Sequence, residues 1–384
     1  MTIRSCAEKS EAFRACKYSY EHREEQLQQC RGKKVAALGW GVPEELIRAH
    51  GLTVFPVWAQ QRTELPEAER YLEYSFAPKA RDWFDAVLER VGGADYLAVA
   101  DSEDVVNRIY YYLREIRREE PERDMPELCM IDLLFSRHLI VQQWNEKAYA
   151  RFAATLEQWA GPCPAGAVED SIRQNAVILG KLRALSALRK SDEPRLTGTE
   201  WLVIVGGGFF MERARYEAAL DRLLEEVPGW DAVEGTRLFY TGSVQQELSV
   251  YERIEAQGFV IVGEDHDWGD RYCQRPLRTD LEPFKALTDR YMLTPPSAQK
   301  GLVRERLEVL RENVTASSAE TVLFYSDVYE EAASWDHPAQ KRMLDEMGIL
   351  SAELNKMPFP PVGEAFEAEL RRAVLALKGG TENG

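Results

Sequence analysis

Short apolar segments alternate with polar segments of helical length through the first third of the chain, and this alternation most constrains the fold. The apolar segments are rich in branched and aromatic residues, which is typical of strands buried on both faces of a sheet. They are "VAALGW", "LTVFPVW", "YLAVAD" and "LCMIDLLF", at residues 35–40, 52–58, 96–101 and 128–135. Because parallel strands need crossover connections, we predict an α/β domain with a parallel sheet.

A second series of apolar segments follows a helical stretch. Between residues 145 and 190 the sequence has helical periodicity, and "EKAYARFAATLEQWAG" places Tyr149, Phe152, Leu156 and Trp159 on one face. Five further strands are then predicted, at residues 201–207, 237–243, 259–265, 321–327 and 349–354. The predicted fold is therefore α/β, with two Rossmann-like, doubly wound lobes joined by a helical connector. The predicted boundaries are 1–144 for an N-terminal helix plus the first lobe, 145–195 for the connector, and 196–384 for the second lobe with a C-terminal helix.

The two predicted lobes share a sequence pattern. "WGVPEELIRAHGLTVFPV" and "GSVQQELSVYERIEAQGFVIV" both run from a glycine at a strand end through V-x-x-E-L into a helix. Each helix ends at a glycine, Gly51 or Gly258, in a position suited to a left-handed helix stop. We interpret the lobes as two copies of one unit.

Charge and cysteine content exclude several classes of function. The 48 basic and 64 acidic residues give a net charge of −16, which repels phosphate backbones, so no nucleic acid partner is expected. No apolar stretch is long enough to span a bilayer, and the first 25 residues are charged throughout, so we expect a cytoplasmic protein with no membrane contact. The six cysteines are widely spaced, which argues against a zinc ribbon and against a disulfide framework.

Residues that follow the predicted strands are the first candidates for function, because open parallel sheets bind ligands at the carboxyl ends of their strands. "VGGGFFMER" resembles a phosphate-binding loop, but it matches neither common glycine-rich motif, which argues against a dinucleotide site. "GEDHDWGDRYC" (residues 263–273) is dense in metal-ligand residue types, and a polar loop with a turn would have the same composition. We favour the loop and leave the metal site as the alternative.

Three serines near strand ends could be nucleophiles or helix caps. Ser102 and Ser243 lie outside any G-x-S-x-G motif, so a nucleophile is not supported. Ser102 and Ser326 are followed closely by acidic residues, a pattern that favours capping of the next helix. For the last crossover helix we predict Asp336 as the N-cap, with Trp335 packed at its start.

Several of these segments, taken in order, carry a family resemblance. They are "GVPEELIRAHGL", "ADSEDVVNR", "AYARFAATLEQWAG", "LFYTGSVQQELSVYERIEAQGFVIVGEDHDWGDR" and "VLFYSD". The chain resembles the 2-hydroxyacyl-CoA dehydratase and benzoyl-CoA reductase subunit family, which includes the 2-hydroxyglutaryl-CoA dehydratase D-component. The resemblance runs from about residue 30 to the end and rests on the order of the motifs.

The resemblance implies two Rossmann-like lobes with a 4Fe-4S cluster between them, held by three cysteines, and an acyl-CoA bound beside it. It also implies an ATP-driven iron–sulfur activator that supplies one electron. Carried onto this chain, the ligand positions fall near Phe76, at Ser102 or Glu103, and at Ser326. None is a cysteine, and such clusters are held by soft thiolates, so we expect this chain to lack its own cluster and assign no metal ligand.

Three functions remain open at this stage. The favoured one is a subunit of a dehydratase- or reductase-type complex that binds an acyl-CoA thioester in the cleft between its lobes while a paralogous subunit holds the metal. The second is a cluster-bearing (R)-2-hydroxyacyl-CoA dehydratase subunit with unusual ligands, drawn from Glu103, Asp327 or Cys273. The third is a CoA-binding or structural protein without a redox step.

Two sets of residues are predicted to form the site. Backbone amides at glycine-bearing strand ends can approach an extended thioester or a phosphate, which nominates Gly41, Gly207, Gly208, Gly242 and the neighbouring Ser243 as cofactor-binding residues. Carboxylates and an imidazole at the same ends can move protons beside a thioester, which nominates Glu103, Asp104, His266 and Asp327 as catalytic residues.

Overall fold

The computed structural model describes residues 3–295 and 300–379. The chain forms two compact units, and each is assembled from separate stretches of sequence. Within the described residues, the β1–β4 unit comprises residues 22–179, 275–295 and 300, and the β5–β8 unit comprises residues 3–21, 180–274 and 301–379. The predicted boundaries were continuous, whereas in the structure residues 3–21 join the second sheet and residues 275–295 join the first.

The β1–β4 unit is built on a parallel sheet of four strands in the order β2-β1-β3-β4. The strands are β1 Lys34–Leu38, β2 Thr53–Pro56, β3 Tyr96–Ala100 and β4 Glu127–Ile131. β3 is buried along its whole length, as its unbroken apolar sequence predicts. All four strands predicted for this lobe are confirmed.

Helices connect the strands of this sheet and pack around it. They are α3 Arg23–Gln29, α4 Glu44–Ala49, α5 Pro66–Tyr71, α6 Pro78–Leu88, α7 Asp104–Glu119, α8 Leu139–Ala160 and α14 Pro283–Leu293, with a 3-10 turn at Val91–Gly93. The predicted helical connector is two helices, α8 and α9 Ala167–Lys190, and α9 continues into the β5–β8 unit.

The β5–β8 unit repeats the strand order of the first, as β6-β5-β7-β8, and all its pairings are parallel. Its strands are β5 Thr236–Gly242, β6 Phe259–Glu264, β7 Thr321–Asp327 and β8 Leu350–Met357. The matching order supports the interpretation of two copies of one unit. The two glycine helix stops are confirmed, because Gly51 and Gly258 have φ angles of 74° and 88°.

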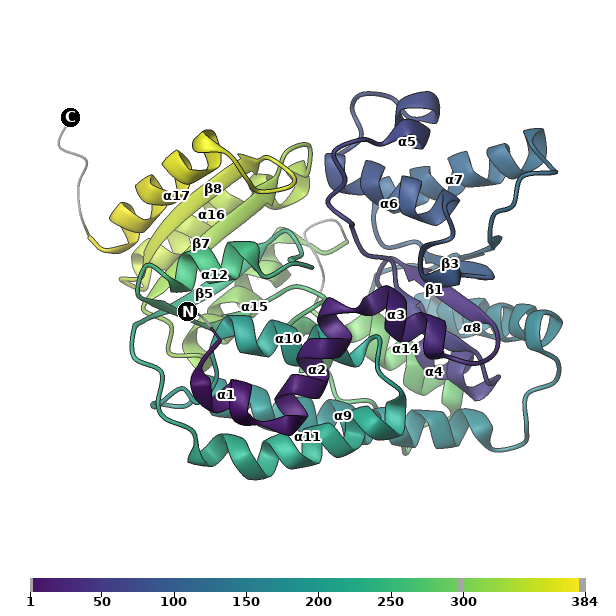
Figure 1. The fold of residues 1–384 in the computed structure, drawn as a ribbon, viewed down its shortest axis with the longest axis horizontal. Helices are drawn as coiled ribbons and strands as arrows, with labels where there is room; N and C mark the ends of the chain where they lie inside the picture. Colours follow the sequence, from purple (N-terminus) through teal and green to yellow (C-terminus); the bar gives the residue numbers. More distant parts are fainter. Residues whose placement is uncertain (1–2, 296–299, 380–384) are drawn as a thin grey trace. The chain divides into compact units, whose positions relative to one another are not determined.

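The helices of this unit pack on its sheet and on one another (Figure 1). They are α1 Ser5–Lys9, α2 Glu11–Glu21, α10 Gly198–Gly208, α11 Arg213–Glu226, α12 Ser249–Glu255, α13 Asp270–Gln274, α15 Val303–Ala316, α16 Glu331–Glu346 and α17 Glu364–Leu377, with a 3-10 turn at Val227–Gly229. The N-terminal helix α2 packs against α10 and α11, which explains why the first residues belong to this unit.

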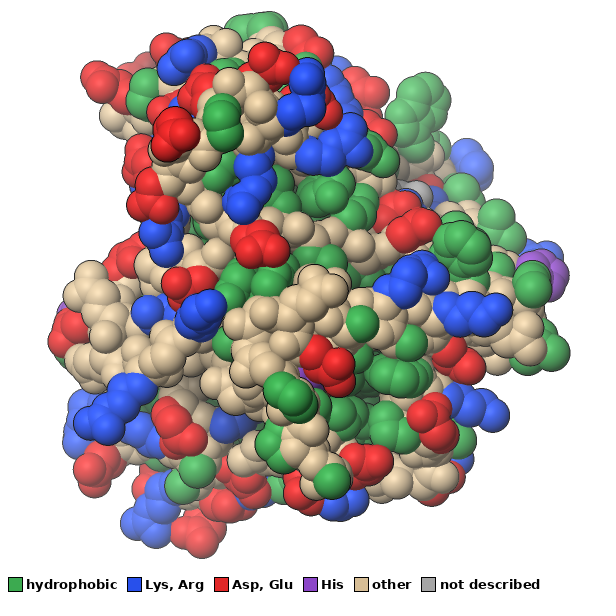
Figure 2. All heavy atoms as spheres, turned by 90° about the vertical axis from the view of Figure 1, so that its right-hand side faces the viewer, with side chains coloured by type: hydrophobic (Ala, Val, Ile, Leu, Met, Phe, Trp, Pro, Cys, Tyr) green, Lys and Arg blue, Asp and Glu red, His purple; other side chains and the backbone are tan. Residues whose placement is uncertain are grey.

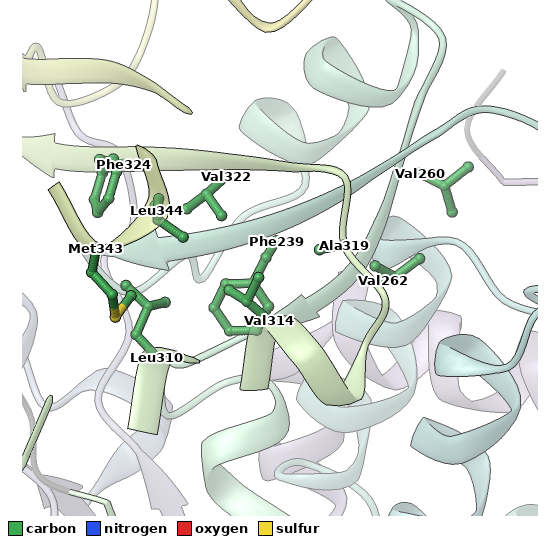
Figure 3. Packing of buried hydrophobic residues seen from close by; sticks show 10 residues of the cluster. All are labelled: Phe239, Val260, Val262, Leu310, Val314, Ala319, Val322, Phe324, Met343 and Leu344. Carbon is green, nitrogen blue, oxygen red and sulfur yellow. The ribbon is translucent and has the colours of Figure 1, made fainter. Parts of the chain in front are cut away.

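One face of the second sheet packs against α15 and α16 (Figure 3). Alternate strand residues such as Phe239, Val322 and Phe324 meet Leu310 of α15 and Leu344 of α16, and all are at most 6% exposed. Because neighbouring strand residues point to opposite faces, the intervening residues Leu238, Tyr240, Leu323 and Tyr325 belong to the other face. The second face therefore receives two buried tyrosines near the strand ends.

The predicted strand at residues 201–207 is wrong, because this segment lies inside helix α10. Thr197 and Glu200 form a reciprocal capping box at the start of the helix, a signal the apolar run conceals. Every residue of α10 is buried, and a continuous apolar run does not distinguish a fully buried helix from a buried strand. The other strands predicted for this lobe are confirmed.

The start of α16 also differs from the prediction. The helix begins at Glu331, so Asp336 lies inside it and pairs with Arg306 of α15 instead of capping. Trp335 is 80% exposed and does not pack at the helix start. The helix contains an internal proline, Pro338, although proline is most frequent in the first turn of a helix.

The surface carries charges of both signs. Figure 2 shows acidic and basic side chains interspersed with apolar ones over the face it draws. Among the described residues, no helix combines the length and the apolar character that crossing a bilayer requires.

A buried glutamate makes the stability of the β5–β8 unit depend on pH. The Glu255 carboxylate accepts hydrogen bonds from the amides of Gly198, Thr199 and Ile261 and from the Thr199 hydroxyl, at 2.6–3.2 Å. Burial raises the pKa of Glu255 to about 7, despite these hydrogen bonds. The folded protein therefore holds a proton that the unfolded chain releases near pH 4.5, and this group lowers stability as the pH rises from about 4.5 to about 7.

We expect Glu255→Gln, which mimics the protonated acid, to remove this dependence. Relative to wild type, the variant should gain on the order of 2 kcal/mol between pH 5 and pH 8, measured by urea denaturation at each pH. A difference in unfolding free energy that stays constant over this range would contradict the assignment.

Candidate functional site

The carboxyl ends of β5 and β7 meet at the switch point of the second sheet, where doubly wound folds bind ligands. Gly242 ends β5 with φ 125°, and a Cβ there would lie 1.9 Å from the Tyr325 carbonyl oxygen. The Ser243 amide donates to that same oxygen at 2.9 Å, and the Asp327 amide donates to Ser243 Oγ at 3.0 Å. The structure thus brings together three predicted site residues, Gly242, Ser243 and Asp327.

A layer of buried aromatic side chains lies beneath these strand ends. The Tyr251 hydroxyl and His266 Nε2 share a hydrogen bond of 2.8 Å, and the Tyr240 ring meets the imidazole edge-on at 5.6 Å between centroids. Tyr240 donates to the Ser243 carbonyl and accepts from Gln245, both at 2.7 Å. Burial raises the pKa of Tyr240 and of Tyr251 well above the usual value, so both hydroxyls stay neutral. His266 is held inside this layer and is 2% exposed.

Asp265 is a site residue that the sequence analysis did not nominate. Its carboxylate accepts from the Thr241 hydroxyl at 2.6 Å and from the Gly242 amide at 3.4 Å, and so ties the end of β6 to the end of β5. Burial raises the pKa of Asp265 to about 6, although the Thr241 hydrogen bond opposes the shift. A carboxyl group with that pKa can exchange a proton near neutral pH. The signal for it was its position as the last residue of the predicted strand 259–265.

The acidic loop after β6 is held by a buried arginine. Arg189 binds Glu264 through two nitrogens at 2.6 and 3.0 Å and also binds Asp270 at 2.9 Å. Lys190 pairs with Asp270 at 2.7 Å, and Trp201 donates to Glu264 at 2.9 Å. In the described part of the chain, no group of three or more His, Cys, Asp or Glu side chains is arranged to hold a metal ion. These carboxylates shape the loop, which supports the polar-loop interpretation.

The carboxyl ends of β1 and β3 form the equivalent switch point of the first sheet. Gly39 and Gly41 follow β1 with φ angles of 86° and 112°, and the Gly41 carbonyl accepts from the Tyr149 hydroxyl at 3.1 Å. After β3, Glu103 is the residue that precedes helix α7, and Asp104 is the first residue of that helix. Three predicted site residues, Gly41, Glu103 and Asp104, therefore lie at the ends of β1 and β3.

Both predicted serine caps are wrong. The N-cap position of α7 falls on Glu103, one residue after Ser102, and the Ser102 hydroxyl is buried with no hydrogen-bond partner among the described residues. Ser326 lies within β7, where its hydroxyl donates to Asn355 Oδ1 at 2.7 Å and accepts from the Lys356 amide at 3.2 Å. Because β7 continues through Ser326 to Asp327 and the next helix begins only at Glu331, Ser326 is too far from that helix to cap it.

Gly207 and Gly208 do not lie at a strand end. Both are within α10, where a Cβ on Gly207 would lie 2.3 Å from the Cys16 carbonyl oxygen and one on Gly208 would lie 2.1 Å from the Tyr216 ring. These glycines allow α2 and α11 to pack closely on α10. Neither glycine therefore offers a strand-end amide to a ligand, which was the reason for nominating them.

The residues at the positions implied for cluster ligands do not fit an iron–sulfur cluster. Phe76, Ser102 and Ser326 offer no thiolate. The cysteines are all free, and the two most buried, Cys16 and Cys273, have their pKa raised to about 12 by burial, so they are neutral thiols. We therefore derive no chemical step through such a cluster in this chain.

Two α/β units with one strand order, each with polar residues at the switch point of its sheet, define a duplicated Rossmann-like protein. The chain belongs to the 2-hydroxyglutaryl-CoA dehydratase, D-component family, whose model matches residues 39–356. No curated protein matches the chain significantly. The family confirms the resemblance seen in the sequence.

Gly242 is expected to be irreplaceable for packing reasons. Gly242→Ala should lose about 2 to 4 kcal/mol of unfolding free energy, because the added methyl meets the Tyr325 carbonyl and the backbone has positive φ. Gly258→Ala is the matched control, since it shares positive φ but has open space, and should lose about 1 kcal/mol. Equal losses in urea denaturation would show that the close strand contact does not matter.

Arg189 is expected to be essential for the acidic loop. Arg189→Met should lose about 3 to 5 kcal/mol, because it leaves Glu264 and Asp270 buried with less compensation. The control Arg222→Met removes the exposed pairs to Glu225 and Glu226 and should stay within about 0.5 kcal/mol of wild type. Thermal and chemical denaturation would measure both, and a mild effect of Arg189→Met would contradict this role.

Proposed function

We propose that this chain is a subunit of a 2-hydroxyacyl-CoA dehydratase or benzoyl-CoA reductase type of system, which binds an acyl-CoA thioester and carries no 4Fe-4S cluster of its own. Membership of the D-component family supports the class of system. The metal-dependent step then belongs to a paralogous partner subunit, which an ATP-dependent iron–sulfur activator would supply with electrons.

The observation that carries the proposal is the way two of the three implied ligand positions, Phe76 and Ser326, are occupied. The Phe76 ring is 1% exposed, packs edge-on against Tyr112 at 5.7 Å between centroids, and lies under the Arg108 guanidinium at 4.0 Å. A packed aromatic side chain at this position leaves neither a sulfur nor the room for one. The Ser326 hydroxyl is likewise engaged with Asn355.

The chain's own residues then bind the substrate and move protons. In this proposal the turns at Gly41 and at Gly242 and Ser243 contact the acyl-CoA. The Gly242 and Ser243 amides are bonded within the protein, to Asp265 and to the Tyr325 carbonyl, so at this turn the Ser243 side chain and the backbone surface make the contact. Glu103, Asp104, His266 and Asp327 remain the proposed proton-moving groups. Asp265 joins them, because its pKa of about 6 suits proton exchange near neutral pH.

Anaerobic purification followed by iron and acid-labile sulfide analysis tests the cluster part of the proposal. We expect colourless protein with far less than one iron per chain, before and after reconstitution with iron and sulfide, because no thiolate set is available. About four irons per chain with a brown, oxygen-sensitive absorbance would establish the cluster-bearing alternative instead.

Isothermal titration with CoA, acetyl-CoA and 2-hydroxyglutaryl-CoA tests the binding part of the proposal. Saturable binding of at least one of these ligands is expected. Failure of all three to bind would reject this function in favour of a structural role.

A further inference from the structure

Four apolar side chains lie exposed at the start of helix α8, in the β1–β4 unit. Leu139 and Ile140 begin the helix and are 68% and 72% exposed, and Trp144 follows one turn later at 41%. Ile140 and Trp144 share a face of the helix because they are four residues apart. Leu134, in the loop that leads from β4 to α8, is 42% exposed. We call these four residues the α8 patch.

Side-chain hydrogen bonds hold this loop against the helix. The buried Asn145 side chain accepts from the Leu134 amide at 3.0 Å and donates to the Leu134 carbonyl at 2.8 Å. The Trp144 indole donates to the Asp132 carbonyl at 3.1 Å. These bonds place Leu134 beside the first turns of α8 and fix the Trp144 ring against the loop. The α8 patch is therefore a preformed surface, which loses little conformational freedom when a partner binds it.

The side chains around the α8 patch are basic, although the chain is acidic. Arg137 and Lys147 are exposed, and within residues 3–295 and 300–379 neither takes part in a salt bridge. Arg151 lies over the indole ring of the patch, with its guanidinium carbon 5.5 Å from the ring centroid. Residues 132–151 hold three cationic and two anionic side chains, whereas the whole chain has a net charge of −16. The apolar patch is thus bordered by cations that have no carboxylate partner in the described chain.

These features select the kind of partner. Exposed apolar side chains that gather within a polar rim are typical of protein interaction surfaces, and Trp and Arg are enriched at the energetic centres of such surfaces. A symmetric contact between two copies of this chain through the patch would bring the same cations together, so like charges oppose it. An anionic membrane is repelled by the net charge of −16. A protein that presents an apolar surface bordered by carboxylates fits both the patch and its rim.

We propose that the α8 patch is the surface on which the paralogous partner subunit docks, through an apolar area bordered by Asp and Glu side chains. This inference rests on the proposed function, which assigns the metal-dependent step to that partner. The four apolar side chains form the centre of the contact, and the surrounding cations pair with carboxylates of the partner at its rim. The patch is then the part of this chain that recruits the subunit holding the metal.

Association of full-length variants with the purified paralogous subunit, measured by analytical ultracentrifugation, tests this proposal. Ile140→Asp should weaken association about tenfold or more, because it places a carboxylate in the apolar centre. The variant should keep its fold, since Ile140 is exposed and an acidic residue in the first turn of a helix is favourable. Lys147→Glu should weaken association about three- to tenfold, and wild-type association should weaken as NaCl rises from about 50 to about 500 mM.

Val177→Asp is the matched control, because Val177 in α9 is another exposed apolar helix residue of the same unit, at 46%. It should bind the paralogous subunit as wild type does. Unchanged association of Ile140→Asp would overturn this inference while leaving the proposed function intact. Self-association of wild type, or binding to phosphatidylserine vesicles, that Ile140→Asp abolishes would show that the patch has a different occupant. No association of wild type with the paralogous subunit in the micromolar range would overturn the subunit role in the proposed function as well.

Discussion

The buried contact between Arg189 and the two carboxylates of Glu264 and Asp270 is the interaction on which the β5–β8 unit depends most. It joins the end of α9 to the end of β6 and to the start of α13, and Trp201 of α10 donates to the same Glu264. Charges in a protein interior are tolerated only when they are paired and hydrogen-bonded, so this set fixes the path of residues 264–270. Asp265 and His266 owe their positions at the strand ends to that path.

Both sheets have polar residues at the carboxyl ends of their strands, but the side chains at these ends differ in their chemistry. At the second sheet, Gly242 at the end of β5 lies very close to the backbone of β7. Two neutral tyrosine side chains contact His266. At the first sheet, the glycine turn after β1 lies close to the Ser102 hydroxyl, which has no hydrogen-bond partner among the described residues. Among the described residues, the strand ends carry hydroxyl, carboxyl and imidazole groups, and the positions of Ser102 and Ser326 hold no cysteine.

Most strands were predictable from local sequence. Eight apolar segments became strands because β-branched and aromatic runs bounded by turn residues have few other stable arrangements in a chain of this length. Gly51 and Gly258 ended their helices as expected, since glycine alone adopts positive φ without cost. The predictions that failed were the strand at residues 201–207, the two serine caps and the start of α16. In these places packing partners or the phase of the helix decided the local structure.

The candidate site was only partly predictable. Strand-end position sufficed to nominate Gly242, Ser243 and Asp327, because strand ends converge in any parallel sheet. Asp265 ends a predicted strand and could have been nominated by the same rule. The tyrosine layer could not, since which face a strand presents and which hydroxyl meets which ring depend on register between strands. The loss of Gly207 and Gly208 from the site has a similar cause, because only tertiary packing on Cys16 and Tyr216 shows why they are glycines.

The sequence by itself determined the fold class, the duplication, the family and the absence of cysteine from the implied ligand positions, because each is written in local composition and motif order. Only the tertiary structure decided that a buried arginine occupies the acidic loop, that Phe76 fills its position, and that the Ser102 hydroxyl has no partner. Those facts depend on groups far apart in sequence, such as Arg189 and Glu264 or Gly39 and Ser102, whose meeting is set by sheet order and helix packing.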